Sequence, residues 1–166
     1  ILPDAVAIHD LIAIYSGDGT LLPRTLAELC ENVRDFVVVE EQGAVIGCGA
    51  LHLNGMHLAE IRSIAVHPSA QGKGAGRLLM KALLAEARRQ HVSCVCLFTR
   101  IPRFFAGSGF KIARREDLPD KIHKDCLNCP KFHACDEVAM VRGELPDYAV
   151  LQQQNIGRML LKLGAS

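Results

Sequence analysis

The spacing of apolar residues predicts two helices at the start of the chain, followed by a change to strand spacing. Residues 3–17 place apolar side chains at helical intervals behind a proline, and residues 23–33 predict a second, shorter helix. The side chains expected to face inward from these helices are Val6, Ile8, Leu11, Ile12, Tyr15, Leu26, Leu29 and Cys30. Residues 36–39 and 44–53 then predict a strand and its return strand, joined by a tight turn.

The middle of the chain predicts a hairpin and then a strand, a turn, a helix and another strand. Asn54-Gly55 is a strong short-turn signal, so residues 57–66 are expected to form a third strand antiparallel to the second. After a glycine-containing turn, residues 74–90 predict a helix whose buried stripe is expected to be Leu78, Leu79, Ala82, Leu83 and Ala87. The continuous apolar run at 92–99 is typical of a strand buried on both faces.

The last third of the chain predicts short elements around a polar segment. A short helix is expected at 102–108, a strand at 109–114 and a last strand at 137–142. Residues 117–135 are polar and irregular and contain cysteines and lysines, so they are interpreted as an insertion. Apolar spacing at 148–163 predicts a final helix. The order of elements indicates an α/β fold class, with a mixed sheet flanked by helices.

Length and composition indicate one folded domain. The chain has 166 residues, of which 49% are apolar and 22% charged. We expect a single domain over 1–143 and a C-terminal helical extension over 144–166. The net charge of +1 argues against a broad contact with nucleic acid or an anionic membrane. No apolar run reaches about 18 residues, nothing at the start resembles a signal peptide, and the first residue, Ile1, leads us to expect a preceding segment.

Seven cysteines divide into two groups. Four are scattered in apolar stretches and are expected to be small buried residues of a cytoplasmic protein: Cys30, Cys48, Cys94 and Cys96. Three cluster in the insertion, where Cys126, Cys129, Cys135 and His133 are expected to hold a structural zinc ion, with His123 as the alternative fourth ligand. The same spacing leaves open reduced, packed thiols or a labile disulfide.

Three alternating glycines between a predicted strand and a predicted helix form the most informative motif. Gly72, Gly74 and Gly76 let backbone N–H groups approach an anion at a helix N-terminus, which suits a pyrophosphate. A P-loop would need a Ser or Thr that is absent here, and Arg77 stands where a dinucleotide fingerprint needs its third glycine. A glycine-rich turn without a ligand is the remaining alternative.

The motif and its surroundings resemble the GNAT superfamily of acetyl-CoA-dependent N-acetyltransferases over about residues 4–143. The family signature stands here as Gln71-x-x-Gly74-x-Gly76, and a later family motif is matched by residues 104–110. The resemblance implies the GNAT fold and acetyl-CoA as cosubstrate. It also implies that coenzyme A is bound by Ile64, Ala65, Val66, Gln71, Gly72, Lys73, Gly74, Ala75, Gly76 and Arg77.

Within that superfamily the chain is similar to short bacterial amino-acid N-acetyltransferases of the N-acetylglutamate synthase type. The matching segments are 60–68, 97–100 and 118–132, the last of which includes the insertion. The longer synthases carry an amino-acid-kinase domain, and from the 166 residues we expect none here. The resemblance implies acetyl transfer to the α-amine of an amino acid, expected to be L-glutamate, in arginine biosynthesis.

Two residues are candidates for proton transfer. The α-ammonium group of an amino acid must lose a proton before it attacks a thioester, so a base is required. Glu60 is a lone carboxylate among apolar strand residues, and the family resemblance also assigns the base to this position. The resemblance implies that Thr99 protonates the leaving thiolate. The alternatives are an ordinary surface-strand glutamate and a threonine that merely ends a strand.

An acidic acceptor requires cations. The resemblance implies that Arg24 and Arg100 bind the substrate carboxylates, and Arg62 is a third candidate, although each is also compatible with a surface arginine. The expected partner is therefore a small-molecule amino acid, with no nucleic acid and no membrane, while a homodimer is left open. Two alternatives are another small-molecule or protein N-terminal acetyltransferase, and a non-catalytic acetyl-CoA sensor with a cysteine switch loop.

Overall fold

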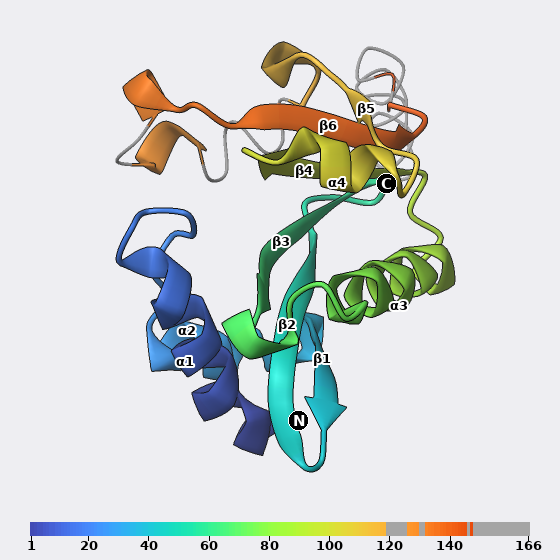
Figure 1. The fold of residues 1–166 in the computed structure, drawn as a ribbon. Helices are drawn as coiled ribbons and strands as arrows, with labels where there is room; N and C mark the ends of the chain where they lie inside the picture. Colours follow the sequence, from blue (N-terminus) through green and yellow to red (C-terminus); the bar gives the residue numbers. More distant parts are fainter. Residues whose placement is uncertain (119–125, 130–131, 146, 148–166) are drawn as a thin grey trace, which may run out of the picture.

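The computed structural model describes residues 1–118, 126–129, 132–145 and 147. Within these residues six strands form one mixed sheet in the order β1-β2-β3-β4-β6-β5, as Figure 1 shows. The strands are β1 (Phe36–Glu41), β2 (Ala44–Leu53), β3 (Leu58–Val66), β4 (Cys94–Thr99), β5 (Lys111–Ile112) and β6 (Val138–Gly143). The predicted α/β fold class is confirmed, and the expected strand at 109–114 is reduced to two residues.

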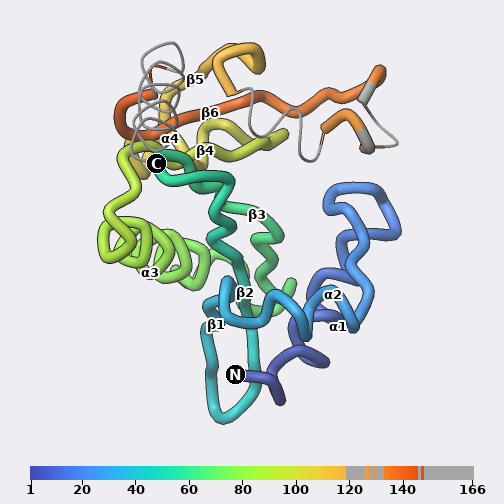
Figure 2. Tube along the Cα trace, turned by 180° about the vertical axis from the view of Figure 1, so that it is seen from behind, coloured from blue at the N-terminus to red at the C-terminus, as the bar shows by residue number. Residues whose placement is uncertain are grey.

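Helices cover both faces of the sheet. The helices are α1 (Ala5–Ser16), α2 (Leu26–Glu31), α3 (Ala75–Arg89) and α4 (Pro102–Ala106). Figures 1 and 2 show α1 and α2 on one side of β1 to β3 and α3 on the other. Short 3-10 turns stand at Leu2–Asp4, Val33–Asp35, Pro68–Ala70, Arg115–Asp117, Cys126–Asn128 and Phe132–Ala134. The helix expected at 148–163 lies outside the described residues.

Local turn chemistry places the two hairpins where the sequence predicts them. Gln42 and Gly43 join β1 to β2, both with positive φ (52° and 80°), as a tight turn between antiparallel strands requires. The Asn54-Gly55 signal is confirmed, because β3 follows antiparallel to β2. At the start of α2, Thr25 and Glu28 cap each other's backbone N–H groups in a capping box.

The predicted buried faces of three helices are partly wrong. In α3 the buried residues are Ala75, Leu79, Met80, Leu83, Leu84 and Ala87, whereas the expected Leu78 and Ala82 are exposed. In the first two helices Val6, Leu26 and Cys30 are exposed, and Ile8, Leu11, Ile12 and Leu29 form the core. The reason is geometric: α2 has only six residues, so one side chain reaches the core, and the rotation of each helix is set by the sheet beneath it.

The sheet opens between its two central strands. β3 and β4 pair in parallel only from Leu58–Cys94 to Glu60–Cys96, although both strands continue beyond that point. An irregularity in the β2–β3 register lies close by, with Ser63 at a φ of 54°. The strands therefore diverge after Glu60, as β3 turns downward from β4 in Figure 1. This divergence creates the space for the site described below.

None of the helices in the described part of the chain is both long and apolar enough to cross a membrane.

Candidate active site

A cavity of about 560 Å³ occupies the gap between the diverging strands. It is lined by the second half of β3, the end of β4, the glycine turn and the start of α4. Of the residues predicted to bind coenzyme A, nine line it: Ile64, Ala65, Val66, Gln71, Gly72, Gly74, Ala75, Gly76 and Arg77. Lys73 does not line it. The cavity is thus elongated between strand backbone at one end and a helix N-terminus at the other.

The glycine turn has the backbone conformation of an anion-binding turn. Gly72 and Gly74 have φ values of 75° and 96°, and Gly74 precedes the first residue of α3. The first N–H groups that bond within this helix belong to Arg77 and Leu78, and both donate to the Gly74 carbonyl. The N–H groups earlier in the turn have no helical acceptor, so they are available to an anion at the positive end of the helix.

The third glycine of the turn packs closely against an aromatic ring. A Cβ atom at Gly76 would lie 3.1 Å from the ring of Phe104. That ring stacks edge-on against Phe105 at 4.9 Å between centroids, and Phe105 in turn contacts Phe110 at 6.3 Å. The two sequence motifs, at 71–76 and at 104–110, are therefore in direct contact, and α4 covers the start of α3.

Tyr15 lines the larger cavity, a role that its position in the sequence did not indicate. Its hydroxyl donates to the carbonyl of Val66 at 2.5 Å and accepts from the side-chain amide of Gln71 at 2.7 Å. Helix α1 is thereby tied to the end of β3 and to the glycine turn. The only sequence signal for Tyr15 was its place on the inward face of a predicted helix.

A second cavity, of about 130 Å³, adjoins the first. Both are lined by Thr20, Leu21, Ile61, Arg62, Ser63, Phe98 and Glu137. The smaller cavity adds Arg24 and Glu60, the latter 4% exposed. A buried carboxylate and two arginines, three of the predicted site residues, therefore meet in one small space beside the larger cavity.

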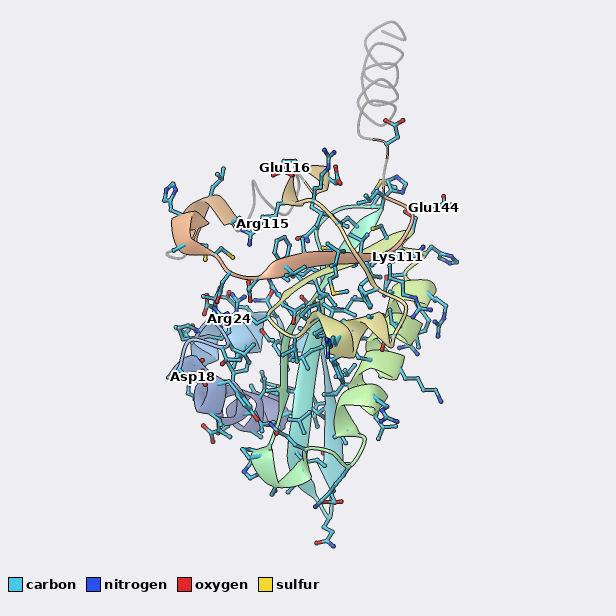
Figure 3. The ribbon with its side chains drawn as sticks, turned by 45° about the horizontal axis from the view of Figure 1, so that its top comes forward. Asp18, Arg24, Lys111, Arg115, Glu116 and Glu144 are labelled. Atoms are coloured by element: carbon cyan, nitrogen blue, oxygen red, sulfur yellow. The ribbon has the colours of Figure 1, made fainter. Side chains whose placement is uncertain are left out.

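Two of the three arginines that line the smaller cavity, Arg24 and Arg62, also act on a common carboxylate. The pKa of Glu28 is lowered first by the backbone N–H of Thr25, and further by the positive charges of Arg24 and Arg62. Arg24 comes from the segment between α1 and α2, where Figure 3 labels it, and Arg62 comes from β3. The positive potential here is therefore built by two elements far apart in the sequence.

Thr99 lies at the end of β4, buried, and lines the larger cavity. Its hydroxyl oxygen accepts a hydrogen bond from the N–H of Ile101 at 3.0 Å. Since the oxygen is the acceptor in this contact, the hydroxyl proton can be donated elsewhere. Thr99 and the second half of β3 line the same cavity, so the Thr99 hydroxyl can donate its proton to a ligand bound there.

Arg100 has structural partners that the sequence did not indicate. Its Nε lies 2.8 Å from both carboxylate oxygens of Asp136, and its Nη1 donates to the carbonyl of Gly19 at 2.8 Å. The hydrogen bond to Asp136 is the largest cause that raises the pKa of Arg100 above its ordinary value. Arg100 lines the larger cavity rather than the smaller one, and it joins the loop after α1 to the segment before β6.

Arg115 and Glu137 are cavity residues that sequence reasoning missed. Nη2 of Arg115 donates to the carbonyl of Glu137 at 2.7 Å and contacts the sulfur of Cys135 at 2.9 Å, and its guanidinium lies over the Phe98 ring at 5.6 Å. Figure 3 shows Arg115 in the segment that follows β5. Neither residue belongs to a short sequence motif. Both lie beside the cavity because β6 pairs between β4 and β5 in the sheet.

The expected zinc site is not supported. In the part of the chain that the structure describes, no three His, Cys, Asp or Glu side chains are grouped closely enough to hold a metal ion. Cys126, Cys129 and Cys135 instead line the smaller cavity, and Cys135 faces Arg115 and Glu137, while the ring of His133 is not among the lining groups. The alternative ligand His123 lies outside the described residues. Sequence spacing alone could not show that these three cysteines line a cavity.

The sequence profile of the acetyltransferase (GNAT) family matches residues 7–109. An uncharacterized N-acetyltransferase of Chlorobaculum tepidum is 43% identical over 141 residues, which are 85% of this chain and 91% of that protein. An amino-acid acetyltransferase of Mycobacterium tuberculosis is 40% identical over 110 residues, 64% of this chain and 63% of its own length. An amino-acid acetyltransferase of Ralstonia nicotianae is 35% identical and is matched over 28% of its length. The chain thus spans less than two thirds of these last two relatives.

Two solved structures are also similar. A Mycobacterium tuberculosis protein in complex with coenzyme A and a second ligand has a TM-score of 0.75 and 30% identity, with 87% of this chain and 96% of that chain covered. N-acetylglutamate synthase of Neisseria gonorrhoeae, in complex with coenzyme A and N-acetyl-glutamate, has a TM-score of 0.76 and 28% identity. That match covers 86% of this chain and 33% of the synthase chain.

Proposed function

The chain belongs to the GNAT family of acetyl-CoA-dependent acetyltransferases, and we propose that it acetylates the α-amine of an amino acid, with L-glutamate as the acceptor. Relatives called amino-acid acetyltransferases support the acceptor class, as does the similarity to a synthase bound to N-acetyl-glutamate. The observation that carries the proposal is the smaller cavity, where Glu60, Arg24 and Arg62 meet beside the larger one. The resemblance to N-acetylglutamate synthases supports the further proposal that the reaction serves arginine biosynthesis.

The larger cavity is the proposed coenzyme A site. The N–H groups of residues 72–76 bind the pyrophosphate, and Arg77 adds positive charge. The backbone of Ile64 and Ala65, which β4 no longer pairs with, binds the acetyl carbonyl and the pantetheine arm. One of these N–H groups stabilises the oxyanion that forms during attack on the thioester.

The reaction is direct transfer in a ternary complex. Glu60 takes a proton from the α-ammonium group, and the neutral amine attacks the thioester carbonyl. The carbon–sulfur bond then breaks, and the Thr99 hydroxyl donates a proton to the departing thiolate. Arg62 and Ser63 line both cavities. The amine of an acceptor in the smaller cavity therefore meets the thioester of acetyl-CoA in the larger cavity near these two residues.

The charges around the smaller cavity favour an acidic acceptor. Arg24, Arg62 and Arg115 line it together with the carboxylates of Glu60 and Glu137. If Glu60 receives the α-amine, Arg24 and Arg62 remain for the two carboxylates of glutamate, which a guanidinium binds through paired hydrogen bonds. Arg100, held by Asp136 and Gly19, is proposed to position the loop that carries Arg24.

The size of the smaller cavity favours a free amino acid over a protein N-terminus. About 130 Å³ is well below the about 300–1,000 Å³ of pockets that hold drug-sized ligands. A thiol-release assay with acetyl-CoA and each of the twenty amino acids tests the acceptor. Glutamate should give the highest kcat/KM, and another preferred amino acid or a peptide would replace glutamate in the proposal. Tight acetyl-CoA binding with no turnover on any acceptor would indicate a sensor instead.

Replacing Arg24 with glutamine should raise the KM for glutamate about 10–100-fold, because a hydrogen bond to a charged group contributes about 1.5–3 kcal/mol. The KM for acetyl-CoA should stay within twofold, since Arg24 lines only the smaller cavity. Arg24→Lys should restore only part of the affinity, because an ammonium lacks the planar fork. Arg88→Gln, at an exposed site on α3, is the matched control. Equal losses for both substrates would show that Arg24 maintains the fold rather than binding glutamate.

Cysteine alkylation offers a test of where the acceptor binds. Cys126, Cys129 and Cys135 line the smaller cavity, so saturating glutamate together with coenzyme A should slow their reaction with iodoacetamide, as measured by mass spectrometry. Cys30 is exposed and serves as the internal control whose rate should not change. Burial raises the pKa of Cys48 to about 12 and of Cys94 to about 11, so neither should react in the folded protein. Unchanged rates at all three cavity cysteines would argue that the acceptor binds elsewhere.

A further inference from the structure

The proposed base needs a route by which its proton reaches water. Glu60 is only 4% exposed, and its carboxylate faces the smaller cavity. Once an acceptor fills that cavity, bulk water no longer reaches the carboxylate from this side. A proton taken from the α-ammonium group must therefore leave through the protein, or remain on Glu60 until the product has gone.

His52 is the residue directly opposite Glu60 in the sheet. In the antiparallel β2–β3 ladder the Cα partner of Glu60 is His52. Directly opposed residues project to the same face of the sheet, with Cβ atoms about 4.5–5.5 Å apart. The neighbouring pair Leu51–Ile61 projects to the other face, into the core beneath α3. Glu60 and His52 therefore share the face that carries the smaller cavity.

Asp35 holds the imidazole from the far side. Nδ1 of His52 lies 2.9 Å from Oδ2 of Asp35, in the 3-10 turn just before β1. An ionised carboxylate only accepts hydrogen bonds, so Nδ1 carries the proton and donates it to Asp35. This tautomer leaves the Nε2 lone pair as the second proton site of the ring. The contact therefore orients the imidazole with Nδ1 toward Asp35.

The exposure of the three residues increases in the direction away from the cavity. Glu60 is 4% exposed, the His52 side chain 15% and the Asp35 side chain 29%. They lie on three successive segments, β3, β2 and the turn before β1, so they form a row across the sheet. The row connects a carboxylate buried beside the cavity to the solvent at the β1 edge of the sheet, and Figure 2 shows β1, β2 and β3 from behind.

We propose that His52, oriented by Asp35, carries the substrate proton from Glu60 to solvent. Glu60 first takes the proton of the α-ammonium group and becomes a neutral acid. The acid passes this proton to Nε2 of His52, so that Glu60 is a carboxylate again and the ring is an imidazolium paired with Asp35. The imidazolium then releases one proton to water, which restores the starting state. This inference rests on the proposed role of Glu60 as the base.

Charged groups other than these three also face this row. Arg62 projects from β3 on the same face as Glu60, two residues further along. Glu28 on α2 lies close enough to Arg62 for the arginine to lower its pKa, after the larger effect of Thr25.

The test compares His52→Gln with the matched control His9→Gln, using whichever amino acid the panel identifies as acceptor. Glutamine can hydrogen-bond to Asp35 but cannot carry a proton. His52→Gln should lower kcat on the order of 10–100-fold, with both KM values within twofold and the Tm unchanged. His9 lies on the outer side of α1 with its Nδ1 3.3 Å from Oδ1 of Asp10 and lines neither cavity, so its replacement should leave kcat unchanged.

Chemical rescue separates proton transfer from packing. Added imidazole should raise kcat of His52→Ala at least fivefold, with the effect of substituted imidazoles following their basicity. An unchanged kcat in His52→Gln, while Glu60→Gln is severely impaired, would overturn the relay and leave the proposed base intact. Impaired His52 variants that no imidazole rescues would show a structural role and overturn it as well. Full activity in Glu60→Gln would refute the base and the relay together.

Discussion

Replacing Glu60 with glutamine should lower kcat on the order of 10²–10⁴-fold, the usual contribution of a positioned general base. The amide keeps the shape of the side chain and its place beside Arg62 but cannot accept the proton of the α-ammonium group. Steady-state thiol release should show this loss with both KM values nearly unchanged, since Glu60 lines only the smaller cavity and acts in the chemical step. The acid limb of the pH–rate profile should also change.

Glu40→Gln provides the matched control, because Glu40 is a strand glutamate on β1 that is exposed to solvent. Its activity should equal that of the parent protein. If Glu60→Gln kept both its kcat and its pH profile, Glu60 would be structural, and the proton would have to leave by another group or by water. A fall in Tm accompanying the loss of activity would be inconclusive for Glu60→Gln, so Glu60→Asp serves as a second variant. Higher activity in Glu60→Asp than in Glu60→Gln would support proton transfer, because aspartate keeps a carboxylate and glutamine does not.

Replacing Gly74 with valine should weaken coenzyme A binding by about tenfold or more. Gly74 has a φ of 96°, where a β-branched residue is strained by about 1–3 kcal/mol. No atom of the protein lies within 4 Å of a Cβ built there, so the fold itself does not collide with the new side chain. The turn can relieve the strain only by moving the N–H groups that bind the pyrophosphate. Titration calorimetry with coenzyme A measures the change.

Gly43→Val is the matched control for this backbone effect. Gly43 has a φ of 80° in the β1–β2 turn, and a Cβ built there also meets no atom within 4 Å. Its replacement brings comparable strain far from the cavity, so Tm should fall by a similar amount while coenzyme A affinity stays the same. Equal affinity in folded Gly74→Val would rule out the glycine turn as the pyrophosphate site.

The coenzyme side of the site was predictable because its residues are adjacent in the sequence. All ten residues predicted to bind coenzyme A lie within 64–77, in one turn and its flanking strand and helix. Nine of these ten line the larger cavity. The positive φ values of Gly72 and Gly74 are a local backbone feature that glycine adopts readily. The hairpin at Asn54-Gly55 and the doubly buried β4 were predictable for the same reason.

Side chains that face one another across elements were predicted less well. The inward faces of α2 and α3 were partly wrong at Leu26, Cys30, Leu78 and Ala82, because hydrophobic spacing identifies a helix but does not fix its rotation on the sheet. The cysteine spacing suggested zinc, yet the thiols line a cavity, since the packing of β6 and the segment after β5 decides where they point. The contacts of Arg100 with Asp136 and with the Gly19 carbonyl had no signal in the sequence, and its interpretation as a substrate ligand stays a prediction.

The sequence by itself determined the fold class, the family and the glycine turn, because each depends on short-range spacing and on conformations that only certain residues adopt. Only the tertiary structure decided which residues line the smaller cavity, where the acceptor is proposed to bind. Glu60, Arg24 and Arg115 come from three segments that share a cavity only because β3 and β4 diverge and β6 inserts beside β4. The register that sets His52 opposite Glu60 likewise has no local signature, since strand pairing depends on the whole hairpin and its packing.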